Sequence, residues 1–312
     1  MTPPLSGVVG PRTLDAEFPR TTDELATLLR DARAARAGLR LAGLGTWLTA
    51  GHPVRAARTV SLRAMHGIVS YHPADLTLSC GAGTTLAELD EATRPHGQWC
   101  PLAPPGTDLT STVGATIATA MEGPFATTLG RPRSLVLGLE CVDGTGRIIA
   151  AGGRVVKNVA GFDLTRAMIG AWGTLGAITL VHLRLRARPV VDETWAIRLP
   201  SSDRSALEAF VRGPLAPLAC VRHQPPSGES RDPAMFLVRL GGNAAFVEAS
   251  RAALRALGET MPQAPDALDA WRAFDDPPAR ALSWRWDPIA VRLRDRFDPD
   301  RILNPGLLGE PA

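Results

Sequence analysis

Three short glycine-containing turns are the segments of this sequence best suited to hold an anionic ligand. Small residues at a turn let backbone N–H groups approach a ligand closely, and such amides form an anion site suited to a pyrophosphate. Any one of these turns alone is more often a simple chain reversal, so the prediction depends on their occurring together. The three are Gly43-Leu44-Gly45-Thr46, Thr112-Val113-Gly114-Ala115 and Gly170-x-x-Gly173-x-x-Gly176.

Lys157 is the only lysine in the chain, although Lys and Arg together number 34. A buried ammonium is a compact charge that fits beside an anionic group where a forked guanidinium is bulkier. Chance is the alternative explanation, so the lone amine is supporting evidence only. Its neighbour is Asn158, and Asp163 follows nearby. Asp163 either contacts a ligand or caps a turn and pairs with Arg166.

Histidines and cysteines give little support for metal or nucleophile chemistry. The six histidines show no H-x-H or H-x-x-x-H spacing, so no metal site is expected. His223 is a weak candidate for a catalytic base, because a lone histidine in a short strand is more often structural. The four cysteines are too far apart in the sequence to form a C-x-x-C metal site or to bind an iron–sulfur cluster, and we expect them to be reduced, buried thiols. They are Cys80, Cys100, Cys141 and Cys220.

Hydrophobic spacing predicts the elements that position the turns. A strand, Leu39–Ala42, runs into the first turn, and the second turn opens a small-residue helix, Ala115–Ala120. An alternating strand, Leu180–Leu185, follows the third. The other elements expected before Pro189 are a helix from Leu25 to Ala35, strands at Thr59–Leu62 and Leu76–Cys80, a helix capped by Thr84 or Thr85, and a strand pair around the hairpin turn Asp143–Gly146.

After Val190 the pattern changes to that of a small α+β lobe. Strands are expected near Thr194–Leu199 and Met235–Leu240, helices near Asp203–Arg212 and Ala244–Leu257, and a long loop over Met261–Ala279. A last helix, Ile289–Phe297, leads to Asn304-Pro305-Gly306. We therefore expect an α+β protein with a ligand-binding domain at 1–189, a small cap lobe at 190–290, and a C-terminal helix and tail at 291–312.

Composition restricts the class of protein. The 312 residues are 45% hydrophobic and 21% charged, which is typical of a globular chain. The net charge of +3 is spread without a basic cluster, so nucleic acid is not an expected partner. No apolar run approaches about 20 residues and no secretory leader is visible, so we expect a cytoplasmic protein without a transmembrane segment.

The order and spacing of the three turns resemble the FAD-binding domain of the vanillyl-alcohol oxidase and p-cresol methylhydroxylase family, over residues 14–189. The first turn lacks the third glycine of a Rossmann fingerprint, so a Rossmann fold is not predicted. The amino-acid sequence of residues 153–164 and 173–176 is most similar to that of the smaller FAD-domain subunits of bacterial glycolate oxidases. Asn304-Pro305-Gly306 resembles the terminal motif of flavin-dependent D-lactate and glycolate dehydrogenases, whose tail packs back on the flavin domain.

This resemblance implies a two-subdomain FAD-binding domain of the p-cresol methylhydroxylase type with a small α+β cap. It implies non-covalent FAD, because Thr46 follows Gly45 where covalent members often carry histidine. Leu44 and Ala115 stand where the family carries glycine, and Ser134 replaces an acid. The first loop therefore has less room for the cofactor, so loss of FAD is the alternative. The residues placed against FAD are Gly43, Leu44, Gly45, Thr46, Pro105, Thr112, Val113, Gly114, Lys157, Asn158, Asp163, Gly173, Gly176 and Ile178.

The function implied by the resemblance is that of an FAD-binding subunit in a glycolate oxidase complex, which oxidises glycolate to glyoxylate. The implied partners are a larger FAD-containing catalytic subunit and an iron–sulfur subunit, through which the chain would also reach the inner membrane. Two alternatives stay open. The chain is a self-sufficient FAD-dependent oxidoreductase on 2-hydroxy acids, or it is a structural subunit that has lost FAD.

Overall fold

The computed structural model describes residues 15–103, 109–153, 164–200, 204–222, 234–263 and 287–309. The helices are α1 (Thr22–Ala34), α2 (Leu86–Thr93), α3 (Val113–Thr119), α4 (Pro132–Leu135), α5 (Leu164–Met168), α6 (Arg204–Arg212), α7 (Ala244–Leu257) and α9 (Pro288–Phe297). The strands are β1 (Leu39–Ala42), β2 (Arg58–Ser61), β3 (Ile68–His72), β4 (Thr77–Gly81), β5 (Gln98–Trp99), β6 (Val136–Asp143), β7 (Ile148–Gly152), β8 (Gly176–Arg184), β9 (Arg186–Ala187), β10 (Val191–Leu199), β11 (Ala219–Arg222), β12 (Ala234–Gly242) and β13 (Glu259–Gln263).

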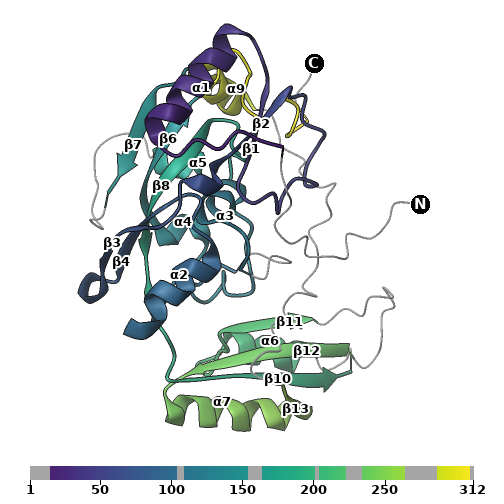
Figure 1. Ribbon diagram of the computed structural model, residues 1–312. Helices are drawn as coiled ribbons and strands as arrows, with labels where there is room; N and C mark the ends of the chain where they lie inside the picture. Colours follow the sequence, from purple (N-terminus) through teal and green to yellow (C-terminus); the bar gives the residue numbers. More distant parts are fainter. Residues whose placement is uncertain are drawn as a thin grey trace.

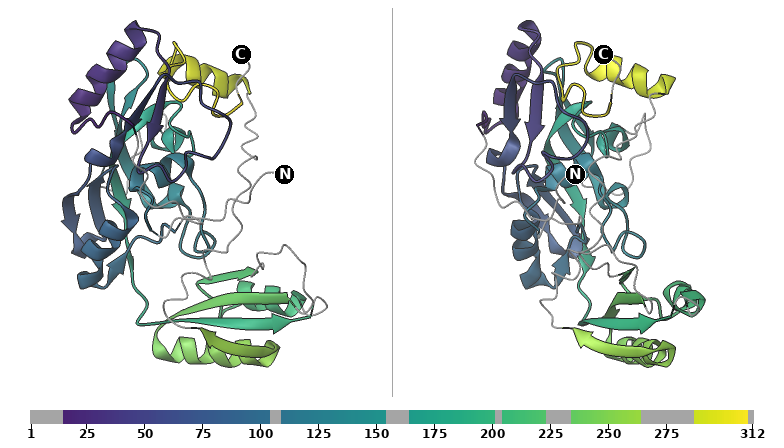
Figure 2. Two further views of the ribbon diagram at one scale, coloured as in Figure 1. Left: turned by 45° about the vertical axis from the view of Figure 1, so that its right-hand side comes forward. Right: turned by 90° about the vertical axis from the view of Figure 1, so that its right-hand side faces the viewer.

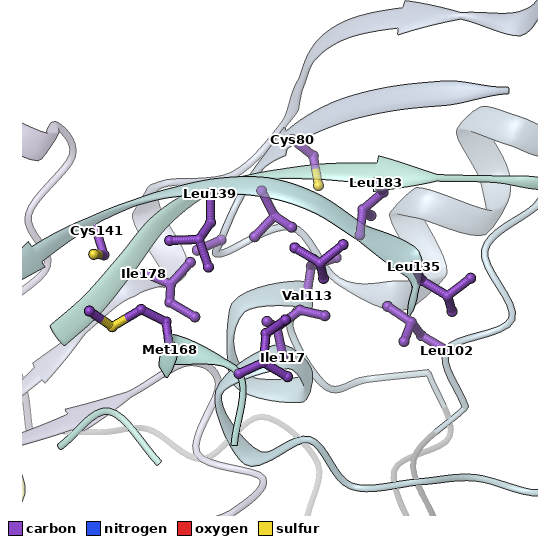
Figure 3. Packing of buried hydrophobic residues seen from close by; sticks show 14 of the residues in the cluster. Cys80, Leu102, Val113, Ile117, Leu135, Leu139, Cys141, Met168, Ile178 and Leu183 are labelled. Atoms are coloured by element: carbon purple, nitrogen blue, oxygen red, sulfur yellow. The ribbon is translucent and has the colours of Figure 1, made fainter. Parts of the chain in front are cut away.

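The larger part of the molecule is built on an antiparallel sheet of order β3-β4-β8-β6-β7. One face of this sheet carries the main hydrophobic core, to which α3 contributes Val113 and Ile117, both fully buried. Figure 3 shows these two side chains packed beneath Leu139 of β6 and Leu183 of β8. The short helix that follows the second glycine turn is therefore fixed against the centre of the sheet.

Four free thiols lie in or beside the cores. Cys80 and Cys141 are fully buried, and burial raises the pKa of each of their thiols to about 12. Cys100 and Cys220 are partly buried, and burial likewise raises their pKa values to about 12. The thiols are protonated at neutral pH and suited to packing rather than to nucleophilic chemistry.

A second, smaller sheet pairs β1 with β2 in parallel, and α1 packs against it. The helix begins where Thr21 accepts a hydrogen bond from the Glu24 N–H at 3.1 Å. On its other edge β1 meets the C-terminal tail, because Leu39 forms a parallel bridge with Leu303. Figure 1 shows the tail and α9 at the same end of the molecule as α1, opposite to β10–β13.

The small lobe is an antiparallel sheet of order β11-β12-β10-β13 with α6 and α7 packed on one face. It lies at one end of the larger part in both views of Figure 2. The sequence predicts β10, β12 and both helices. It predicts a loop from Met261, whereas β13 extends to Gln263 because it pairs antiparallel with β10. The predicted α+β fold is confirmed, and the described strands that the sequence pattern misses are β3, β13 and the two-residue strands β5 and β9.

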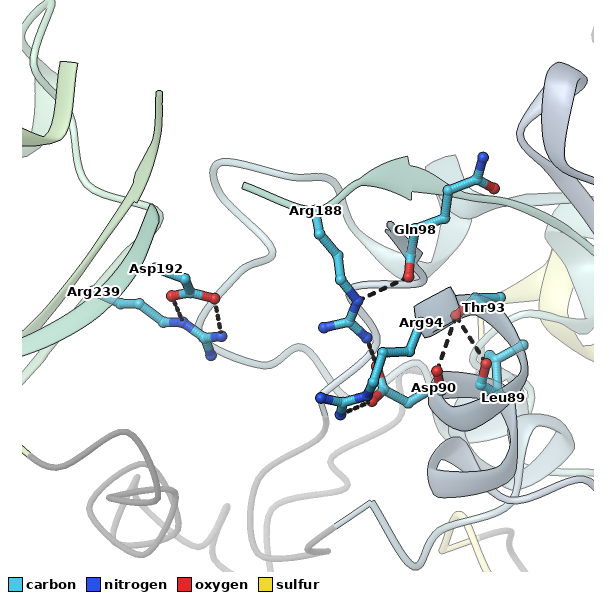
Figure 4. A network of polar contacts seen from close by, with 8 residues as sticks. All are labelled: Leu89, Asp90, Thr93, Arg94, Gln98, Arg188, Asp192 and Arg239. Atoms are coloured by element: carbon cyan, nitrogen blue, oxygen red, sulfur yellow. Dashed lines mark hydrogen bonds and ion pairs between the residues drawn. The ribbon is translucent and has the colours of Figure 1, made fainter. Parts of the chain in front are cut away.

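The opposite face of the lobe sheet contacts the larger part through Trp99 and Phe125, whose rings meet edge to face at 5.2 Å. The Arg239 guanidinium lies 5.0 Å from the Phe125 ring and donates to both Asp192 oxygens at 2.6 Å. On the larger part, Arg188 donates to the Gln98 carbonyl at 2.9 Å and pairs with an aspartate of α2. Figure 4 shows these two arginine clusters facing each other across the junction.

Candidate FAD site

A pocket with an empty volume of about 780 Å³, part of it open to solvent, lies where the small sheet, the main sheet and the C-terminal tail meet. Its walls are mostly apolar, as in most cofactor sites. Its lining comes from β1 and the first turn, from the start of α3, from the third turn with the start of β8, and from the tail. Predicted site residues in this lining are Gly43, Gly45, Thr46, Thr112, Gly114, Gly173, Gly176 and Ile178.

The first turn is fixed through Gly43, and its next amides have no acceptor among the described residues. Gly43 accepts a hydrogen bond from Ser61 Oγ at 2.6 Å. A Cβ atom at Gly43 would stand 2.4 Å from Thr112 Oγ1, so the first and second turns touch only because this residue is glycine. Among the described residues, none accepts a hydrogen bond from the N–H groups of residues 44–47. These amides are free to bind a pyrophosphate.

The second turn uses its amides differently from the prediction. Thr112 caps α3, accepting from the Ala115 N–H at 3.3 Å. The Val113 N–H donates to Thr84 O at 2.7 Å and the Gly114 N–H donates to Ala82 O at 2.8 Å. These two amides are already engaged, so they are not phosphate donors as the sequence suggested. Gly114 instead allows close packing, because a Cβ there would lie 2.6 Å from that of Ala82.

The third turn is tied to the C-terminal tail by Asn304. The Asn304 Nδ2 donates to Trp172 O and its Oδ1 accepts from the Leu41 N–H, both at 2.8 Å. Gly173 has a φ of +68°, and a Cβ on it would stand 2.8 Å from Asn304 Nδ2. One amide side chain, only 3% exposed, thus connects β1 to the third turn across the floor of the pocket.

Two indoles form one wall of the pocket. Trp47 follows the first turn and Trp172 lies in the third, and their ring centroids are 6.3 Å apart in an edge-to-face arrangement. Trp47 Nε1 also donates to Ser111 Oγ at 3.2 Å, beside the second turn. Leu307 of the tail packs against the same cluster. All three turns and the tail are therefore joined around this wall.

Arg40 is the only charged residue among the described residues that line the pocket. It is half-buried on β1 and donates a hydrogen bond from its guanidinium to Leu48 O. Burial lowers the pKa of Arg40, since a charge in an apolar wall loses hydration. The pocket therefore carries positive charge close to the first turn.

The other predicted site residues divide into two groups. Leu44 and Val113 are not part of the lining, and the Val113 side chain is fully buried in the main core. Outside the described residues lie Pro105, Lys157, Asn158, Asp163 and the catalytic candidate His223. The roles of these residues stay predictions.

Among the lining residues that the sequence prediction missed, four contribute a charge, an indole or an amide side chain: Arg40, Trp47, Trp172 and Asn304. Arg40 had a visible signal, because it is a charged residue inside a short apolar strand that leads directly into a glycine turn. Trp47 and Trp172 also stand next to predicted turns. The sequence drew attention to Asn304 only as part of a tail motif, since its contacts with Leu41 and Trp172 join segments far apart in the chain.

These features fit FAD. Apolar and indole walls suit planar aromatic rings, and free amides with a nearby guanidinium suit a pyrophosphate. The described part of the chain contains no group of His, Cys, Asp or Glu arranged to hold a metal ion. In that same part no helix is long and apolar enough to cross a membrane.

Comparison with known sequences points the same way. Residues 16–152 match the family profile described as FAD binding domain. Glycolate oxidase subunit GlcE of Escherichia coli (strain K12) is 33% identical over 201 residues, which cover 64% of this chain and 55% of that protein. D-lactate dehydrogenase of Archaeoglobus fulgidus is 36% identical over 188 residues, 59% of this chain and 41% of that enzyme. The chain thus spans about half the length of these relatives.

Solved structures share the fold at low sequence identity. A structure of p-cresol methylhydroxylase with substrate bound superposes with a TM-score of 0.65 at 13% identity, over 83% of this chain and 61% of that one. An alkyldihydroxyacetonephosphate synthase superposes equally well, with a TM-score of 0.65 at 19% identity, over 83% of this chain and 55% of that one. Residues 16–152 are therefore similar to the FAD binding domain family, the fold is of the p-cresol methylhydroxylase type, and FAD is the cofactor that the match supports.

Proposed function

We propose that this chain is the FAD-binding subunit of a glycolate oxidase complex, which oxidises glycolate to glyoxylate with a larger FAD-containing subunit and an iron–sulfur subunit. The observation that carries the proposal is the pocket, where three glycine turns and the Asn304 tail meet. Further support comes from the identity with subunit GlcE, and from subunit GlcD of Bacillus subtilis, which is 31% identical over 189 residues. Residence in the cytoplasm, with contact to the membrane only through partners, belongs to the same proposal.

In this proposal the chain binds and shields the cofactor, which is held without a covalent bond. The amides of residues 44–47 hold the pyrophosphate, and the Trp47–Trp172 wall excludes water from the rings. Asn304 holds β1 and the third turn in a fixed position relative to each other. When bound, FAD supplies the acceptor for a hydride taken from the α-carbon of a 2-hydroxy acid.

The lining of the pocket favours a subunit over a self-sufficient enzyme. Oxidation of a 2-hydroxy acid needs a base for the hydroxyl proton. Among the described residues that line the pocket there is no His, Asp, Glu or Lys. We therefore assign the base to the partner subunit, and His223 and Lys157 remain the alternatives within this chain.

Purification tests the proposal in two steps. The chain, expressed alone, is expected to carry FAD that denaturation releases unmodified, at about one FAD per chain. It is expected to stay oxidised under anaerobic glycolate or D-lactate, and its flavin absorbance is expected to bleach only after the larger subunit is added. Colourless protein that takes up no FAD would leave the structural-subunit alternative. Rapid bleaching of the isolated chain would establish the self-sufficient one.

A further inference from the structure

Arg40 lines the pocket, and its guanidinium has no carboxylate partner among the described residues. Within the described part of the chain its guanidinium forms one hydrogen bond, to the neutral Leu48 carbonyl, and no ion pair. Burial lowers its pKa, and no acidic neighbour in the described part of the chain acts against that shift. A half-buried cation of this kind loses hydration that a neutral carbonyl replaces only in part. An anionic ligand in the pocket would restore that loss.

Arg40 also stands beside the segment that offers backbone donors. It lies on β1, directly before the first turn, and its hydrogen bond reaches Leu48 directly after that turn. The Arg40 backbone thus precedes the segment whose amides at residues 44–47 have no described acceptor, and its guanidinium lies at the Leu48 end of that segment. A guanidinium bonded to one carbonyl keeps further N–H donors for a second acceptor. Charged and backbone donors at one loop form a site for phosphate oxygens.

We propose that Arg40 is a binding residue for the pyrophosphate of the dinucleotide. This inference rests on the proposed cofactor site and adds to it the source of positive charge. It also explains how a first turn that carries Leu44 in place of a further glycine still holds FAD. The charge-assisted bond of Arg40 replaces contacts that a more open glycine loop would give.

The test compares three variants of the full-length chain after removal of flavin. Arg40→Gln removes the charge, and Arg40→Lys keeps the charge without the planar fork. Arg55→Gln is the matched control, because Arg55 is exposed and does not line the pocket. Dissociation constants are measured for FAD and for riboflavin, which lacks phosphate, at low and high ionic strength.

Arg40→Gln is expected to raise the FAD dissociation constant about 10- to 100-fold, the usual effect of a hydrogen bond to a charged group. The riboflavin constant should change less than about twofold, and the salt dependence of FAD binding should become shallower. The FAD dissociation constant of Arg40→Lys should lie between those of Arg40→Gln and the unaltered chain. That of Arg55→Gln should equal the value of the unaltered chain.

Three results would overturn the assignment. Equal weakening of FAD and riboflavin would show that Arg40 only supports the loop through Leu48. Unchanged FAD binding, with a raised KM for the hydroxy acid in the assembled complex, would assign Arg40 to the substrate carboxylate. If the unaltered chain binds no FAD, there is no pyrophosphate for Arg40 to bind and the assignment fails. Failure of the complex to oxidise glycolate, with FAD binding intact, would overturn the proposed function and leave this inference standing.

Discussion

At the scale of single residues, Asn304 decides whether the tail and the pocket stay connected. It is buried in the left-handed region with a φ of +44°, a conformation that glycine adopts without strain. Asn304→Gly therefore removes both side-chain hydrogen bonds while preserving the backbone. We expect it to lower the free energy of unfolding by about 1 to 3 kcal/mol, because the Leu41 N–H and the Trp172 carbonyl lose their partner. FAD release, followed by stopped-flow fluorescence, should become about tenfold faster.

Asn243→Ala serves as the control for this variant. Asn243 caps α7 in the lobe, far from the pocket in sequence and structure, and accepts from the Phe246 N–H at 2.9 Å. Loss of the cap costs about 1 kcal/mol. If both variants lose stability but release FAD at the same rate, Asn304 does not position the pocket.

The sequence predicted those parts of the site whose structure depends on neighbouring residues in the chain. The glycine turns were visible because a turn depends on its own residue types, and Gly43, Gly114 and Gly173 indeed stand where a Cβ would collide. The engagement of the Val113 and Gly114 amides was not visible, since their acceptors belong to residues 82–84. The contribution of Asn304 likewise depends on a segment that lies more than a hundred residues away.

At the scale of elements, the turn between α9 and the tail is fixed by a buried ion pair. Asp298, fully buried, accepts from the Ile302 and Leu303 N–H groups at 3.0 Å and pairs with Arg294 at 3.2 Å. Asp298→Asn leaves a buried guanidinium without that carboxylate. We expect a loss of about 3 to 5 kcal/mol in the free energy of unfolding, measured by urea denaturation.

Asp300→Asn provides the comparison at the same turn. Asp300 pairs with Arg33 on the surface, and exposed pairs of this kind contribute about 0 to 1 kcal/mol. Equal losses in the two variants would mean that burial of the Arg294–Asp298 pair is not what holds the tail.

Helices and strands with strong periodicity were predicted well, and elements defined by partners were not. The sequence predicts α1, α7 and α9 because each has an apolar face and a capping residue at its start. β13 has little alternation, with Pro262 inside it, and exists through its register with β10. Edge strands of this type are set by the neighbouring strand rather than by their own residues.

At the scale of the whole molecule, the aromatic contact between the larger part and the lobe should control their relative position. Phe125→Ala removes a ring that packs on Trp99 and lies beneath Arg239. We expect a loss of about 3 to 5 kcal/mol for a buried phenylalanine. We also expect a larger radius of gyration in small-angle X-ray scattering, as the lobe leaves its contact.

Phe210→Ala separates these two effects. Phe210 is a residue of α6 that is buried in the lobe's own core, away from the junction. Its truncation should lower stability to a similar degree without changing the radius of gyration of the native state. A radius unchanged in Phe125→Ala would show that the junction is held by the arginine clusters alone.

The indole pair in the pocket wall has an optical consequence. Trp47 and Trp172 are two of the seven tryptophans, and both line the space assigned to FAD. Indole emission overlaps the near-ultraviolet absorption of oxidised flavin, so excitation energy passes efficiently from these donors to a flavin at contact range. The protein therefore contains its own fluorescent reporter of occupancy. Its emission should dim on binding and recover on release without any added label.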